Sequence, residues 1–284
     1  MKTVVVTGVS TGIGAATARA LAKAGFKVFG SVRKAEDAVA LKQEFGDAFQ
    51  PLIFDVTDEA AIAAAAGEVR AALAGTRLNG LVNNAGASIA GPLALQPPAD
   101  FRKQIEINLV GPFLVTQAFI PLLGADPDLA GAPGRIVNIS SVGGKMGAPF
   151  IGAYAASKHA LEGYSESLRR ELQLFGIDVI IIGPGAVVTP IWDKAEADGI
   201  GPYAGSPYEA PMRAFSAWFL ELGRSTGYPP EHIAGVVLKA LTTPKPKVRY
   251  AVVPKALANS ILPQVLPKRM VDRTMGKAIG LLPK

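Results

Sequence analysis

Short apolar runs alternate along the chain with longer helix-forming segments such as the alanine-rich stretch Ala60–Ala74. A strand that is apolar at every position is buried on both faces, which is typical of a parallel sheet covered by helices. The alternation therefore predicts an α/β fold with a doubly wound parallel sheet. The clearest strand candidates are Val4–Val6, Leu81–Val82, Ile136–Ile139 and Val179–Ile182.

A glycine-rich turn follows the first predicted strand, Lys2–Val6, and precedes a predicted helix over Ala15–Ala24. Glycines there let the backbone approach a pyrophosphate, whose charge is met by the N-terminus of the following helix. The turn predicts a dinucleotide site, although such a turn can also serve only to let a loop pass closely over a helix. The predicted contacts are Gly8, Ser10, Thr11, Gly12, Ile13 and Gly14.

The second predicted strand, Lys27–Val32, ends without an acidic residue. In dinucleotide-binding folds, a carboxylate at this place binds the 2′-hydroxyl of the adenosine ribose and repels a 2′-phosphate. Here Arg33 and Lys34 follow instead, and a guanidinium pairs well with phosphate oxygens. These cations favour NADP(H) over NAD(H); the alternative is that they only form a solvated strand end.

Tyr154 and Lys158 are four residues apart in a predicted helix, so their side chains share one face. A phenol titrates near pH ~10, and a nearby cation lowers that pKa by stabilising the phenolate. The pair can therefore act as a proton donor near neutral pH. Taken alone, the same spacing also fits an ordinary solvated helix face.

Further motifs follow successive predicted strands. They are Asp55-Val56, Asn83-Asn84-Ala85-Gly86, Asn138-Ile139-Ser140-Ser141 and Pro184-Gly185-Ala186-Val187-Val188-Thr189-Pro190, together with Asn108 in a predicted helix. With the glycine-rich turn and the Tyr154/Lys158 pair, they resemble the classical short-chain dehydrogenase/reductases from about Lys2 to Pro190. The resemblance implies a Rossmann-like sheet of seven strands and an oxidoreductase that transfers hydride between a nicotinamide cofactor and a carbonyl or alcohol.

The resemblance also implies a catalytic tetrad of Asn108, Ser141, Tyr154 and Lys158. Tyr154 would protonate the carbonyl oxygen as hydride arrives, and Ser141 would hydrogen-bond that oxygen. Lys158 would lower the pKa of the phenol and hold the nicotinamide ribose, while Asn108 would anchor a water that connects Lys158 to solvent. Ser141 is chosen over Ser140 on its spacing to Tyr154 alone.

Other cofactor contacts follow from the same resemblance. Asp55 would contact the adenine amino group, Val56 would line that pocket, and Thr189 would bond the nicotinamide carboxamide. As alternatives, Asp55 would cap the turn after its strand, the two asparagines would secure neighbouring strands, and the Thr-Pro pair would only end a strand. The remaining implied contacts are Asn84, Ala85 and Gly86 near the adenosine ribose, and Pro184 and Gly185 on the nicotinamide side.

The composition limits the classes to which the protein can belong. At 284 residues, of which 49% are hydrophobic, the chain fits one α/β domain with an ample core. It has no cysteine, and its two histidines, His159 and His232, are isolated, which argues against disulfides and against a metal site. The N-terminus enters a strand at once and no run approaches the ~20 apolar residues of a membrane span, so we expect a soluble cytoplasmic enzyme.

The net charge of +6 is concentrated near the C-terminus. Nine basic residues and one acidic residue lie between Lys245 and Lys284, a local charge of +8, so the rest of the chain carries −2. The 254–284 tail also has an apolar stripe broken by Pro263 and Pro267. It predicts either a helix that covers the pocket or makes a subunit contact, or a segment lying on an anionic membrane surface. No motif supports nucleic-acid binding.

Substrate recognition is expected after Pro190, because ligands of open parallel sheets bind outside the carboxyl ends of the strands. Segment 191–230 holds both tryptophans and other large apolar side chains among glycines and prolines, which indicates a lid. Such a lining favours a bulky lipophilic ketone or secondary alcohol, such as a steroid, retinoid or aryl ketone, unless these side chains only pack the lid. The candidate pocket residues are Ser141, Met146, Tyr154, Ile191, Trp192, Tyr203, Tyr208, Met212, Trp218 and Phe219.

The sequence thus predicts an NADP(H)-dependent carbonyl reductase or alcohol dehydrogenase. The alternatives are a dinucleotide-binding regulator without turnover and a membrane-surface enzyme that acts on lipids. Helices around Pro112–Leu123 and Tyr154–Phe175 resemble those that form the dimer contacts of the family, so we expect a homodimer or homotetramer.

Overall fold

Seven parallel strands form one sheet in the order β3-β2-β1-β4-β5-β6-β7. The structure is a computed structural model that describes residues 1–189 and 199–283. The predicted doubly wound, seven-stranded sheet is confirmed. Its strands are β1 (Lys2–Val6), β2 (Phe26–Val32), β3 (Phe49–Ile53), β4 (Gly80–Asn83), β5 (Arg135–Ile139), β6 (Asp178–Pro184) and β7 (Arg249–Val252).

The strand order reverses at the centre of the sheet. β1 pairs with β2 on one side, where Val5 lies opposite Phe29, and with β4 on the other, where Val5 lies opposite Leu81. At such a reversal the connections leave β1 and β4 toward opposite faces, which opens a crevice beyond their carboxyl ends. The glycine-rich turn and the Asn83–Gly86 motif therefore meet at one edge of the sheet.

Helices cover both faces because successive strand residues point in opposite directions. Val4 and Val6 belong to the core cluster under α1 and α9, whereas Val5 and Phe29 belong to the cluster under α3, α5 and α6. The first face carries α1 (Gly12–Lys23), α2 (Ala35–Phe45) and α9 (Pro230–Thr242), and the second carries α3 (Glu59–Leu73), α5 (Gly111–Ile120) and α6 (Gly152–Glu171). Short turns η1 (Gly46–Ala48), η4 (Val142–Gly144) and η5 (Leu172–Phe175) join these elements.

One long helix corrects the expectation that no run approaches a membrane span. Residues Pro98–Ala125 form a nearly continuous helix, interrupted at Gly124 (φ +153°), that is long and apolar enough to cross a membrane, but half of the apolar window is buried inside the protein. Val115 and Phe119 are fully buried in the core beneath the sheet. Packing against protein thus accounts for the apolar character. The helix comprises α4 (Pro98–Ile105), η2 (Glu106–Val110), α5 and η3 (Pro121–Ala125).

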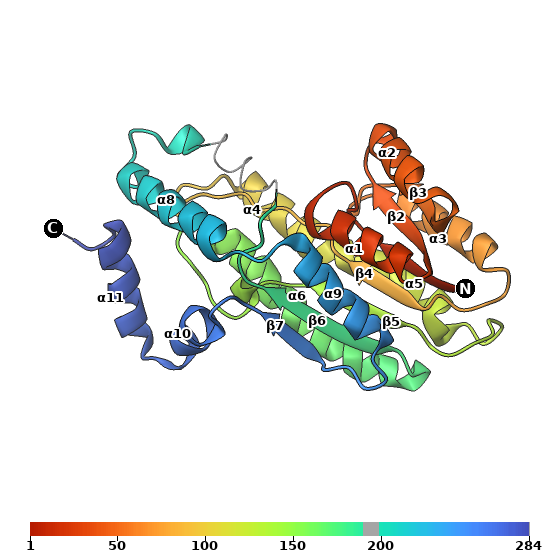
Figure 1. The fold of residues 1–284 in the computed structure, drawn as a ribbon. Helices are drawn as coiled ribbons and strands as arrows, with labels where there is room; N and C mark the ends of the chain where they lie inside the picture. The colour runs from red at the N-terminus through yellow and green to blue at the C-terminus, as the bar shows by residue number, and fades with distance from the viewer. Residues whose placement is uncertain (190–198, 284) are drawn as a thin grey trace.

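The segments at the end of the chain form a third, smaller core. Phe150, Tyr203, Met212, Phe215 and Ile279 pack together and are buried. Figure 1 shows α8, α10 and α11 together at the end of the molecule away from the N-terminus. The elements are η6 (Gly201–Tyr203), α8 (Glu209–Thr226), η7 (Leu257–Ile261), α10 (Leu262–Val265) and α11 (Lys268–Ile279).

Candidate active site

Glycines shape the turn after β1. Gly8 adopts a positive φ of +69°, and a Cβ at Gly14 would collide with the carbonyl oxygen of Gly8. The side-chain amide of Asn84 donates to the carbonyl oxygens of Thr7 (2.9 Å) and Gly8 (3.0 Å), while the Thr7 hydroxyl accepts from the backbone of Asn84 and Ala85. Asn84 therefore clamps the turn with its side chain, as the structural alternative predicted.

The N-terminus of α1 is suited to an anion. The helix begins at Gly12, three residues earlier than predicted, because Thr11 is still extended (φ −150°, ψ 174°) and acts as its N-cap. In the described chain, Thr11 makes no side-chain capping bond, and the first turn of α1 holds no acidic residue. Its backbone N–H groups can meet a phosphate, so the turn of Gly8, Ser10, Thr11, Gly12, Ile13 and Gly14 fits the phosphates of a dinucleotide.

The end of β2 is joined to the glycine turn. The Ser31 hydroxyl accepts from Gly8 N at 3.1 Å, and the Ser31 carbonyl accepts from Val9 N at 3.0 Å. Arg33 and Lys34 come next and are exposed. Two cations thus lie beyond the turn that fits the phosphates, where a 2′-phosphate would be read.

Asp55 caps its own turn. One of its carboxylate oxygens accepts from Thr57 N at 3.0 Å and from the Thr57 hydroxyl at 2.8 Å. Val56 beside it is buried and packs against Gly111, where a Cβ would lie 2.8 Å from the valine side chain. Asp55 therefore caps the turn after its strand in this structure, as the alternative predicted. The adenine contacts expected for Asp55 and Val56 stay predictions.

Tyr154 and Ser141 meet at the start of α6. Ser141 lies close enough to the Tyr154 phenol to influence its pKa, and the Ser141 hydroxyl accepts from Gly143 N at 3.0 Å. A Cβ at Gly143 would lie 3.3 Å from the Tyr154 ring and 3.4 Å from the Ser141 hydroxyl. The Tyr154 ring and the Ser141 hydroxyl therefore both pack against Gly143.

Lys158 lies one helical turn after Tyr154 and is buried. Its ammonium donates to the Ile139 carbonyl oxygen at 2.9 Å and lies 5.8 Å from the centre of the Tyr154 ring. A Cβ at Gly86 would lie 3.2 Å from the Asn108 amide oxygen and 3.8 Å from the Lys158 ammonium. Gly86 thus lies between Asn108 and Lys158, so the tetrad predicted from the sequence forms one cluster.

Asn108 occupies a π-helical turn, a local widening that recurs at functional sites. Its amide group bonds both the N–H and the carbonyl of Ala87 at 2.8 Å, and it donates to the Ser157 hydroxyl at 3.0 Å. The Asn108 side chain is therefore committed to protein partners. Any water that it anchors would have to be held largely by its backbone carbonyl.

Burial moves the pKa values of Tyr154 and Lys158 in opposite directions. It raises the pKa of Tyr154, against the opposing effect of the Ser141 hydrogen bond, and it lowers the pKa of Lys158 to about 8. The sequence predicted a lowered phenol pKa, which is not the direction found in this structure, because exclusion of water outweighs the stabilisation of the phenolate. Tyr154 is therefore a neutral donor at pH 7.

The predicted substrate residues divide into three groups. Tyr203 and Met212 are buried in the third core, which supports the alternative that they pack the lid. Trp218 is half-exposed and contacts Phe219, while Met146 is partly buried. Ile191 and Trp192 lie outside the described residues. On the nicotinamide side, a Cβ at Gly12 would lie 3.3 Å from Thr189, and Gly185 N donates to Val252 O, next to Pro184 at the end of β6.

A shallow hollow of about 250 Å³ lies beside the start of α6. Tyr208 contributes to its wall, as predicted, and so does Leu281 from the C-terminal segment, which the sequence analysis missed. The sequence feature that indicates this position is Gly280, a glycine that ends α11 with a φ of +75° and turns the chain back toward the fold. The other lining residues are Pro92, Leu93, Ala94, Ala148, Pro149, Phe150 and Gly152.

A family model described as short chain dehydrogenase matches residues 2–199. The chain belongs to the short-chain dehydrogenase family. This membership makes the protein an oxidoreductase and agrees with the order of the motifs around Tyr154 and Lys158.

Relatives of this short-chain dehydrogenase include the NADPH-dependent 3-dehydrocapnine reductase of Ornithobacterium rhinotracheale, 38% identical over 99% of both chains. A short-chain dehydrogenase structure from Streptomyces avermitilis has a TM-score of 0.78 and 28% identity, and the match covers 99% of this chain and 97% of that one. A metagenomic short-chain oxidoreductase in complex with NADP has a TM-score of 0.68 and 31% identity, covering 89% and 96%.

The buried Lys158 ammonium gives a stability prediction. Lowering its pKa from 10.5 to about 8 corresponds to a folding cost of about 3 kcal/mol, and removing its bond to Ile139 loses about 1 kcal/mol. We expect Lys158→Met to raise the free energy of unfolding at pH 7 by about 2 kcal/mol while reducing activity.

The pH dependence provides the check. Because the folded-state pKa lies below the unfolded one, the unfolded chain binds more protons between pH 8 and 10.5, so wild-type stability rises with pH there. The advantage of the variant should therefore shrink between pH 7 and pH 9.5 in urea denaturation. A variant less stable than wild type at pH 7 would contradict the expectation.

Proposed function

We propose that the protein transfers hydride between NADP(H) and a bulky lipophilic ketone or the corresponding secondary alcohol. The observation that carries the proposal is the cluster of Tyr154, Ser141 and Lys158 at the carboxyl end of β5. A phenol and a hydroxyl that lie close together can both hydrogen-bond one carbonyl oxygen, which is what general acid catalysis of ketone reduction requires.

NADP(H), when bound, supplies the hydride. Tyr154 donates its phenolic proton to the substrate oxygen, and Ser141 hydrogen-bonds that oxygen as negative charge develops on it. Lys158, with a pKa of about 8, both releases and accepts a proton near neutral pH. It is therefore suited to re-protonating Tyr154 through a water held near Asn108.

The NADP(H) preference is supported by two kinds of evidence. Arg33 and Lys34 are exposed beyond the strand that is joined to the glycine turn. A relative of the same length is named an NADPH-dependent reductase, and a similar solved structure holds NADP. Both agree with binding of the 2′-phosphate by cationic side chains.

The lipophilic substrate is supported by an apolar hollow at the start of α6, the helix that carries Tyr154 and Lys158. The hollow beside the start of α6 is lined almost entirely by apolar groups, from the loops before α4 and before α6, from Tyr208 and from Leu281. Apolar walls with few polar groups favour ligands recognised by shape and not by charge. The name of the relative adds 3-dehydrocapnine to the substrates to be tested.

A homodimer or homotetramer remains our proposal for the assembly. Phe113 on α5 is 43% exposed, and its ring packs edge-on against Tyr164 of α6 at 6.3 Å. An exposed aromatic beside the two helices expected at the subunit contact fits such an interface.

A membrane-surface role is the second candidate, favoured by an apolar ridge on the tail. Leu257, Ile261 and Val265 recur at four-residue spacing and are 64%, 50% and 70% exposed. Lys255 and Lys268 flank this ridge and are exposed. Exposed apolar side chains next to cations are typical of segments that lie on anionic lipid surfaces.

Tyr154→Phe should abolish ketone reduction while NADPH binding stays within a few-fold of wild type, because the variant loses only the acidic proton. The assay is NADPH oxidation with acetone, an aryl ketone, a steroid ketone and 3-dehydrocapnine. Tyr164→Phe is the matched control, a partly buried phenol on the same helix, and should keep its activity. Normal turnover by Tyr154→Phe would remove the mechanism, and cofactor binding without any turnover by wild type would favour a regulator.

Arg33→Asp should shift the coenzyme preference toward NADH, since a carboxylate at this place repels a 2′-phosphate and accepts from a ribose hydroxyl. The measurement is the ratio of kcat/KM for NADPH to that for NADH. Lys23→Asp, at the far end of α1, controls for the change of net charge. An unchanged ratio in Arg33→Asp would show that another residue discriminates.

Replacing Leu257, Ile261 and Val265 together by serine tests the membrane candidate. Wild type should sediment with vesicles that contain phosphatidylserine and not with pure phosphatidylcholine, and the triple variant should lose this binding. Leu174→Ser removes an exposed leucine (81%) elsewhere and should have no effect. Equal sedimentation of wild type and triple variant would eliminate the ridge as the docking surface.

A further inference from the structure

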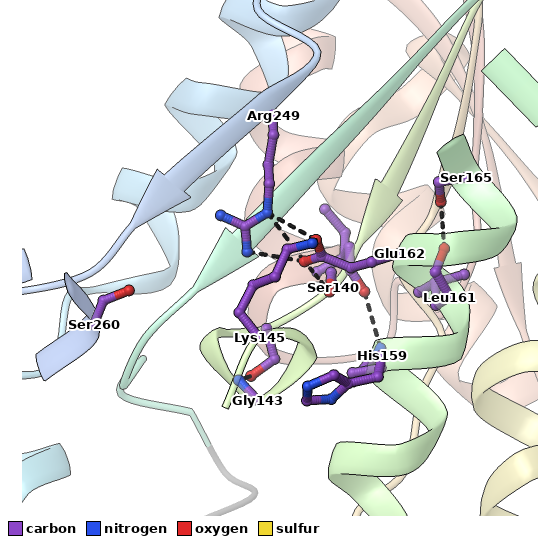
Figure 2. Close-up of polar contacts among 12 residues, drawn as sticks. Ser140, Gly143, Lys145, His159, Leu161, Glu162, Ser165, Arg249 and Ser260 are labelled. Carbon is purple, nitrogen blue, oxygen red and sulfur yellow. Dashed lines mark hydrogen bonds and ion pairs between the residues drawn. The ribbon is translucent and has the colours of Figure 1, made fainter. Parts of the chain in front are cut away.

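A buried carboxylate lies outside the tetrad, one helical turn after Lys158. The Glu162 side chain is 3% exposed and binds two cations: Arg249 donates from two nitrogens at 2.8 to 3.1 Å, and Lys145 lies at 2.9 Å. The Ser140 hydroxyl donates to the same carboxylate at 2.9 Å. Figure 2 shows these side chains converging on Glu162.

The contacts join three segments that are distant in the sequence. Glu162 belongs to α6, Arg249 to β7, and Ser140 and Lys145 to the loop that follows β5. That loop also carries Ser141. Ser140 immediately precedes Ser141, and Lys145 follows it by four residues. Both bind the Glu162 carboxylate.

Two glycines make room for the network. A Cβ at Gly144 would lie 2.6 Å from the Ser140 hydroxyl and 2.9 Å from the Glu162 carboxylate, and one at Gly183 would lie 2.5 Å from the Arg249 guanidinium. Real Cβ atoms do not approach so closely, so a side chain at either place would displace the network. The close approach thus depends on glycine in both the catalytic loop and β6.

The carboxylate is held in its charged form. Burial raises the pKa of Glu162, but the hydrogen bonds from Arg249, Lys145 and Ser140 outweigh burial, and the net pKa is lowered. A buried charge is stabilised by its partners. Displacing any of them leaves the charge uncompensated, which costs free energy and therefore opposes movement. The bonds to Ser140 and Lys145 consequently restrict the loop between them.

We propose that Glu162 is a positioning residue, which with Arg249 and Lys145 fixes the loop after β5 so that the Ser141 hydroxyl faces the substrate oxygen. The proposal rests on the proposed reductase function. Glu162 touches none of the reacting atoms and acts through Ser141. Small displacements of a catalytic group reduce rates strongly, on the order of 10²-fold for ~1 Å.

A double-mutant cycle with Ser141 tests this role. Glu162→Gln, which keeps the shape and removes the charge, should lower kcat by about 10- to 100-fold, with the NADPH Kd within about twofold of wild type. In a Ser141→Ala background the same change should lower kcat by less than about threefold, because the group that it positions is already gone. Equal losses in both backgrounds would overturn the proposal.

Glu44→Gln is the matched control. Glu44 is also bonded by two nitrogens of one arginine, Arg19, but lies half-exposed on the surface between α1 and α2. Its loss should leave kcat unchanged. If Glu162→Gln does not fold, Lys145→Met tests the partly exposed side of the network, and Lys145→Arg should restore kcat.

Hydrogen exchange separates this proposal from the reductase function. The amides of Gly143, Gly144 and Lys145 are all bonded within the loop. They should exchange faster in Glu162→Gln while the rest of the sheet is unchanged, whether or not a ketone is turned over. Unchanged exchange in this loop would overturn the positioning role even if the enzyme proves active.

Discussion

One helix face bound to the end of one strand organises the active site. Three successive turns of α6 present Tyr154, Lys158 and Glu162. Tyr154 lies close to Ser141, Lys158 donates to the carbonyl of Ile139, and Glu162 accepts from Ser140. Each of these helical turns thus contacts one residue of the tripeptide Ile139-Ser140-Ser141, at the carboxyl end of β5. Because four-residue spacing keeps the three side chains on one face, a shift of the helix along the strand would break all three contacts together.

Buried asparagine side-chain amides fix the position of α6 relative to the strands. Asn83 at the end of β4 donates to Thr116 of α5 and to Asn138 of β5, and Asn138 donates to Ser165 of α6. These bonds cross two strands and two helices within the core, where unsatisfied polar groups are costly. The asparagines that end β4 therefore serve two purposes, since Asn83 aligns the helices and Asn84 clamps the glycine turn.

Features set by short spacings were predictable from the sequence, whereas features set by distant partners were not. The strands and the glycine turn follow from local motifs, whereas the grouping of Asn108 with Lys158, 50 residues apart, was implied only by the family resemblance. Glu162 lies four residues after Lys158, so its face was predictable, but its partner Arg249 is 87 residues away. The lid residues Tyr203 and Met212 were taken for pocket walls because nothing in their own segment reveals that Ile279 of α11 packs against the same core.

Burial of the catalytic pair bears on the direction of the reaction. Excluding water destabilises both the phenolate of Tyr154 and the ammonium of Lys158, so the phenol keeps its proton while the lysine titrates at about 8. Ketone reduction starts from the neutral phenol, which is the form present at neutral pH. Alcohol oxidation starts from the phenolate, whose formation burial opposes. In the proposed reaction, the protein alone therefore favours reduction, and alcohol oxidation needs an additional positive charge near the phenol or a higher pH.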